Sequence, residues 1–157
     1  MNKKDIVLIM LVISLALGGC SQNSKNNETT YATQNKVSSL EYGIYMNKQI
    51  QIYINQLTTR MGIARNISHG YDADNEYRLA LDSVNTMQSV YDEVEVVYPS
   101  DNGDDNREDT LLAMNTAIEH MNSYAEAVKN NENLEDYIKD FENDFNQLTG
   151  LANFYTE

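Results

Sequence analysis

Hydrophobic residues recur at alternating intervals of three and four in three stretches of the chain, which is the spacing of an amphipathic α-helix. From 73 to 98 the apolar positions are Ala80, Val84, Met87, Tyr91, Val94 and Tyr98. From 107 to 130 they are Leu111, Met114, Ile118, Met121, Ala125 and Val128. From 134 to 155 they are Leu134, Ile138, Phe141, Phe145, Leu148, Ala152 and Tyr155. Each pattern predicts one helix with one buried face.

A fourth and longer helix is predicted over about 35–69. Its main apolar stripe is Ile50, Ile54, Leu57, Met61, Ala64 and Ile67, and an earlier, offset stripe is Val37, Leu40 and Ile44. A helix of this length spans about 50 Å at the usual rise per residue, so we expect its first turns to project beyond the other helices. Gly43 and Gly62 lie inside it, and each costs about 1 kcal/mol relative to alanine. They are therefore expected at close helix contacts or at a bend.

Short polar turns separate the four segments. His69 and Gly70 are typical of a helix C-terminus, Asp72 or Asp74 can cap the next helix, and Pro99 cannot continue one. Residues 130–133 form the last turn, with Asn133 as the expected cap. Short connections make successive helices antiparallel neighbours. The pattern predicts an all-α, up-down-up-down four-helix bundle without strands, and a helical hairpin that completes the bundle by dimerising remains as an alternative.

The first 20 residues have a different character. Lys3 and Lys4 precede an apolar run over 6–17 that only Ser14 interrupts, and Leu17, Gly18, Gly19 and Cys20 follow. The run is shorter than the roughly 20 apolar residues that a membrane span needs, and the order of charged, apolar and small residues is that of a secretion signal.

This stretch resembles the lipobox signal of bacterial lipoproteins. The resemblance implies cleavage after Gly19 and a diacylglycerol on the Cys20 thiol, to which a further N-acyl chain can be added. No other cofactor is expected. The predicted layout is a signal peptide over 1–19, a lipidated cysteine with a polar, flexible tether over 20–34, and the helical bundle over 35–157. Such a tether has a root-mean-square span of about 20 Å.

Charge is distributed unevenly along the chain, whose formal net charge is −13. Residues 20–71 hold five basic and two acidic side chains, whereas residues 72–157 hold four basic and 21 acidic ones. A nucleic-acid partner is not expected, because binding phosphates requires a basic surface. An anionic membrane surface would repel the domain, so the lipid must provide the anchor. The acidic surplus is either a solvated face or a surface that recruits cations or a basic partner.

Residue spacings give no support for catalysis or a metal site. The acidic residues over 101–106 and 72–76 lack the glycine and glutamate positions of a helix-loop-helix calcium loop. Neither His69 nor His120 has a glutamate three positions earlier, as a di-iron bundle requires. Because His120 precedes Met121 of the apolar stripe, we expect it to point to solvent. The neighbouring Ser68, His69 and Asp72 are interpreted as helix-end residues, so neither an enzyme nor a metal centre is predicted.

Tyrosine is abundant, with 11 copies and no tryptophan. Five tyrosines lie beside the apolar stripes, namely Tyr42, Tyr45, Tyr53, Tyr124 and Tyr137. Tyrosine offers a large, rigid contact area and a hydroxyl, which favours binding surfaces. These five form either the edge of the core or a face that binds a partner.

Together these patterns predict a non-enzymatic protein, anchored by lipid to the outer face of a bacterial cell membrane, that binds another envelope protein or an incoming macromolecule. The Asn- and Lys-rich leader and tether favour a Gram-positive source. An alternative is an exclusion or immunity lipoprotein of a phage or conjugative element. A further alternative is a peptide pheromone released from residues 11–18 of the leader. The oligomeric state is left open.

Overall fold

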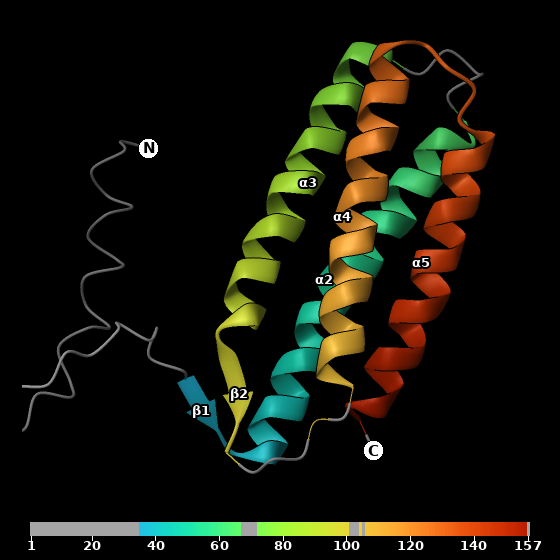
Figure 1. The fold of residues 1–157 in the computed structure, drawn as a ribbon. Coiled ribbons are helices and arrows are strands. Elements are labelled where there is room, and N and C mark those ends of the chain that lie inside the picture. Colours follow the sequence, from blue (N-terminus) through green and yellow to red (C-terminus); the bar gives the residue numbers. More distant parts are fainter. Residues whose placement is uncertain (1–34, 67–71, 101–103, 105, 157) are drawn as a thin grey trace, which may run out of the picture. The chain divides into compact units, whose positions relative to one another are not determined.

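The computed structural model describes residues 35–66, 72–100, 104 and 106–156. Four helices run side by side: α2 (Ser39–Ala64), α3 (Ala73–Glu95), α4 (Arg107–Lys129) and α5 (Glu135–Phe154). Each neighbour in sequence runs in the opposite direction (Figure 1), and α2 also packs against α5 to close the ring. The predicted up-down-up-down bundle is confirmed. One chain supplies all four helices, so the hairpin alternative is wrong as a description of the fold.

Helix α2 buries a different stripe at its start from the one predicted. Tyr42, Met46 and Ile50 are buried in steps of four, whereas Leu40 and Ile44 are exposed. The prediction of an apolar stripe through Leu40 and Ile44 is wrong. The buried face of α2 instead continues from Ile50 back to Met46 and Tyr42, in steps of four residues. The first turns of α2 are therefore packed on the bundle rather than projecting from it.

Two short parallel strands, β1 (Asn35–Val37) and β2 (Val97–Pro99), correct the predicted helix limits and the prediction that strands are absent. Asn35 pairs with Val97 and Val37 with Pro99, and the Ser100 N–H donates to the Val37 carbonyl at 2.7 Å. The predicted helices over 35–69 and 73–98 thus overran into extended backbone. Three-residue strands are too short for their periodicity to show in sequence.

Helix caps explain where the helices begin. Ser38 and Glu41 form a reciprocal capping box, which fixes the start of α2 at Ser39. The Asp72 carboxylate accepts from the Asn75 N–H at 3.2 Å, so Asp72 rather than Asp74 caps α3. The N-cap of α5 is Leu134, without a side-chain cap, so the prediction of Asn133 as the cap is wrong by one position. The Asn133 side chain still accepts from the Glu135 N–H at 3.1 Å. Helix α2 ends at Ala64 with Arg65 as its C-cap, so the predicted end near residue 69 is wrong. His69 and Gly70 themselves lie outside the described residues.

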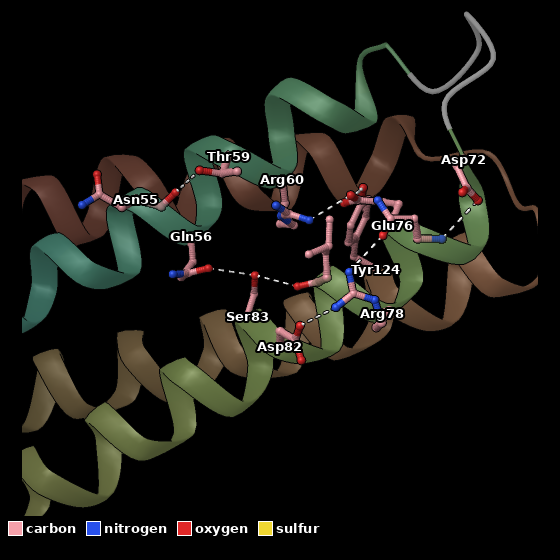
Figure 2. A network of polar contacts seen from close by, with 12 residues as sticks. Asn55, Gln56, Thr59, Arg60, Asp72, Glu76, Arg78, Asp82, Ser83 and Tyr124 are labelled. Atoms are coloured by element: carbon pink, nitrogen blue, oxygen red, sulfur yellow. Dashed lines mark hydrogen bonds and ion pairs between the residues drawn. The ribbon is translucent and has the colours of Figure 1, made fainter. Parts of the chain in front are cut away.

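A buried polar network joins α2, α3 and α4 near the turn between α2 and α3 (Figure 2). Both oxygens of the Glu76 carboxylate are satisfied: one accepts from Arg60 Nη1 and the other from the Tyr124 hydroxyl, each at 2.8 Å. Glu76 is fully buried, and this burial raises the pKa of its carboxyl group, although Tyr124 and Arg60 pull it down. We call the end of the bundle that holds this network the turn end.

A second polar pair corrects the prediction that His120 points to solvent. His120 on α4 is half-buried, and its Nδ1 lies 2.8 Å from Oδ2 of the buried Asp144 on α5. Burial raises the pKa of Asp144, while the hydrogen bond with His120 opposes the shift. The pair links neighbouring helices halfway along the bundle.

None of the described helices is long and apolar enough to cross a membrane.

Candidate functional site

A pocket of about 530 Å³ opens at the end of the bundle opposite the turn end. It lies between the start of α2, the end of β2 and the end of α5, which come together there (Figure 1). Its lining residues are Ser39, Leu40, Tyr42, Gly43, Ile44, Asn47, Pro99, Asp104, Phe154, Tyr155 and Thr156. We call it the end pocket, and we call this part of the molecule the pocket end.

The backbone of α5 is held close to α2 beside the end pocket. The Asn47 side chain donates to the Ala152 carbonyl at 2.8 Å. A Cβ atom on Gly43 would lie 3.1 Å from the Tyr155 carbonyl oxygen, whereas one on Gly62 would meet nothing within 4 Å. Gly43 therefore marks a close contact, as expected, and the same expectation for Gly62 is wrong.

Large apolar side chains stand exposed around the end pocket. Leu40 is 75% exposed, Ile44 62% and Phe154 46%. Exposed apolar residues are ordinary one at a time, but several of them around a concave site are typical of a surface that binds another molecule. We call these three residues the apolar rim.

Polar groups lie among the aromatic rings of the end pocket. The Tyr155 hydroxyl donates to Asp104 Oδ2 at 2.8 Å and lies 3.2 Å from the Thr110 hydroxyl. The other carboxylate oxygen of Asp104 accepts from the Asn106 N–H at 3.0 Å. These contacts fix the positions of the Tyr155 phenol and the Asp104 carboxylate relative to the start of α4.

Tyr42 is the exception among these polar groups. Its side chain is 3% exposed, and its hydroxyl has no partner in hydrogen-bonding geometry among the described residues. Asp104 and Tyr155 nevertheless lie close enough to act on this hydroxyl through hydrogen bonding as well as charge. Burial, with the Asp104 carboxylate, raises the pKa of Tyr42, and burial likewise raises the pKa of Tyr155. Both phenols are therefore protonated at neutral pH.

Three of the five tyrosines proposed for a partner face are in the core, which makes that prediction wrong for them. The Tyr53 hydroxyl donates to the Met87 carbonyl at 2.7 Å. Tyr124 holds Glu76 in the buried network. Tyr42 is 3% exposed and is among the residues that line the end pocket.

The other two tyrosines do not form one face either. Tyr45 and Tyr137 are partly buried. Tyr45 lies in the early turns of α2 and Tyr137 in the first turn of α5, which places them at opposite ends of the bundle. The predicted cleavage site Leu17, Gly18 and Gly19 and the predicted lipidated Cys20 lie outside the described residues.

Sequence reasoning missed the residues that line the end pocket. Leu40 and Ile44 were assigned to the core because they are apolar at helical spacing, although the spacing from Tyr42 to Met46 to Ile50 fits equally well. No pattern in the sequence linked Asp104 to Tyr155. Within the described ranges, no three His, Cys, Asp or Glu side chains gather closely enough to hold a metal ion.

No protein-family model matches this chain, and no curated protein or solved structure matches it either. The functional argument therefore depends on the geometry of the end pocket and on the sequence.

Proposed function

We propose that this chain is a non-enzymatic, lipid-anchored binding protein on the outer face of a bacterial cell membrane, and that it binds a protein partner of the envelope through the end pocket. The observation that carries the proposal is the apolar rim around a pocket of about 530 Å³. An apolar segment of a partner would remove Leu40, Ile44 and Phe154 from water, and each buried side chain of this size contributes roughly 1.5–3 kcal/mol before the costs of association.

The position of the end pocket supports a partner at the membrane. Strand β1 begins at Asn35, and it lies at the pocket end of the bundle (Figure 1). The predicted tether over 20–34 therefore joins the domain beside the pocket. With a lipid on Cys20, a tether of this length would place the start of β1 at a root-mean-square distance of about 20 Å from the anchor. The partner would be the extracytoplasmic part of another membrane protein.

Site-specific photocrosslinking in the native cells tests the proposal. A photoreactive amino acid replaces Ile44 of the apolar rim, and the matched control replaces Leu112, which is 64% exposed but does not line the pocket. We expect one dominant adduct from position 44, none from position 112, and loss of the adduct in a Cys20→Ala background.

The captured protein is then identified and purified, and its binding to the full chain is measured directly. Ile44→Ser is expected to weaken that binding about tenfold or more, since it removes an apolar contact of the interface, and Leu112→Ser is expected to leave it unchanged. Equal effects of the two substitutions would overturn the proposal. An adduct that forms only after phage adsorption or contact with a conjugating donor would favour the exclusion function instead.

A further inference from the structure

Among the described residues that line the end pocket, the one charged side chain is the carboxylate of Asp104. Each of its oxygens already accepts one hydrogen bond, from the Asn106 N–H and the Tyr155 hydroxyl. A carboxylate offers about four acceptor positions in all, so Asp104 can accept further donors from a ligand. An anionic ligand would be repelled at this position, whereas a cationic one would be attracted.

Aromatic rings stand at steep angles to one another around this carboxylate. Tyr42 and Tyr155 have ring centroids 6.1 Å apart with an angle of 72° between their planes. Phe154 and Tyr155 have centroids 5.3 Å apart with an angle of 79°. All three rings line the pocket. The face of an aromatic ring carries negative potential and attracts an ammonium group, so the aromatic lining adds to the attraction that the Asp104 carboxylate exerts on a cation.

The exposed apolar side chains beside the carboxylate are a second observation. Leu40 is 75% exposed and Ile44 62%, and both line the pocket together with Asp104. A purely apolar ligand would cover these side chains but would leave the remaining acceptor positions of Asp104 without a donor. An ammonium group on an aliphatic stem would meet both requirements.

The nearest basic side chain does not compete for this position. Arg107 stacks over the Tyr98 ring, with its guanidinium carbon 4.1 Å from the ring centroid. It also donates to the Glu95 carbonyl at 2.7 Å. It is held by these contacts and is not among the residues that line the end pocket.

We infer that the end pocket accepts a lysine side chain of the partner, with the ammonium group donating to Asp104 and the methylene groups lying along Leu40 and Ile44. This inference deepens the proposed function and rests on it for the source of the lysine. It assigns the specificity of the site to the ammonium group and its affinity to the apolar rim.

Nuclear magnetic resonance titration of the full chain in detergent micelles tests the inference. The probe is n-butylammonium, which has the chemistry of the lysine side chain, and the neutral probe of the same size is 1-butanol. We expect saturable shifts of the backbone amides of Gly43, Asp104 and Tyr155 with n-butylammonium. We expect 1-butanol to bind at least about fivefold more weakly than n-butylammonium, because it lacks the charge that Asp104 and the rings recognise.

Two substitutions complete the test. Asp104→Asn removes the charge but can still accept from the Tyr155 hydroxyl, so the amide spectrum away from the pocket serves as a check on folding. We expect it to weaken n-butylammonium binding about fivefold. Glu95→Gln removes one charge from an exposed position outside the pocket and is expected to leave binding unchanged.

Equal binding of the two probes, equal effects of the two substitutions, or no saturable shift would each overturn the inference. These outcomes are separate from those of the crosslinking experiment. Ammonium binding without a protein adduct at position 44 would refute the proposed function and leave the chemistry of the pocket standing. An adduct without ammonium binding would do the reverse.

Discussion

The two ends of the bundle treat buried polar groups in opposite ways. At the turn end, Arg60, Glu76 and Tyr124 are buried together and bonded to one another. At the pocket end, the Tyr42 hydroxyl is buried without a well-aligned hydrogen bond to any described residue, and large apolar side chains are left in water nearby. At the turn end, the folded chain supplies the hydrogen-bond partners of its buried Glu76 carboxylate. The pocket end is incomplete in the way expected of a site that a second molecule completes.

The largest effect is expected from breaking the buried network at the turn end. Glu76→Ala leaves the Arg60 guanidinium buried without its counter-charge, which typically costs about 3–5 kcal/mol in the free energy of unfolding. The control is Glu142→Ala, which removes the half-exposed partner of Arg65. Its expected cost is below about 1 kcal/mol, because water screens an exposed pair. Urea unfolding followed by circular dichroism measures the free energy of unfolding of both variants. Similar losses of stability would mean that the buried network contributes no more than the exposed ion pair.

Removing a hydroxyl from each of two buried tyrosines on α2 compares a paired with an unpaired group. Tyr53→Phe loses the hydrogen bond to the Met87 carbonyl and is expected to destabilise the fold by about 1 kcal/mol. Tyr42→Phe removes a hydroxyl that has no well-aligned partner among the described residues. The free energy of unfolding of this variant should therefore equal or exceed that of the native chain. Equal losses in thermal unfolding would show that the Tyr42 hydroxyl is satisfied in the free protein.

Two glycines of α2 sharpen the comparison on a smaller scale. Gly62→Ala places a Cβ atom in open space near the turn end and is expected to stabilise the fold by about 0.5–1 kcal/mol through helix propensity. Gly43→Ala places its Cβ atom 3.1 Å from the Tyr155 carbonyl oxygen at the pocket end. The gain in stability of this variant should be smaller, or become a loss, because the new Cβ atom forces the Tyr155 carbonyl to shift. An equal gain in both variants would contradict the close approach of α5 to α2.

The smallest effect is expected from pH. Burial raises the pKa of Glu76 above its ordinary value of 4.5, so the folded chain binds this proton more tightly than the unfolded chain does. The contribution of Glu76 to stability therefore increases as the pH falls from neutral through the raised pKa toward 4.5. Glu76→Gln should show a shallower rise in melting temperature over this window. A slope identical to that of the native chain would contradict the shift.

The four helices could be predicted because each carries an apolar stripe over several turns, which averages out single exceptions. Shorter signals could not. Strands β1 and β2 have three residues each, which is less than one helical repeat. The Ser38 and Glu41 capping box was visible in the sequence as Ser-x-x-Glu, and it would have moved the start of α2 to the correct place.

The candidate site was less predictable because it is assembled from distant parts of the chain. Asp104 and Tyr155 are 51 positions apart, and their meeting depends on how the ends of β2 and α5 pack. For the tyrosines beside the apolar stripes the sequence left core and partner face as alternatives, and burial decides for the core at Tyr53 and Tyr124. The exposed Leu40 and Ile44 were mistaken for core because an apolar residue in a helix is usually buried.

The pairing of β1 with β2 has a mechanical consequence. The chain that leads to the predicted membrane anchor enters the bundle through β1, so a pull on that anchor loads the β1–β2 hydrogen bonds before it reaches the first turn of α2. Through β2 the force passes to the end of α3, and it is shared between two helices. In a chain anchored at Cys20, as proposed, the paired strands would carry this tension before it reached the first turn of the helix that bears the apolar rim.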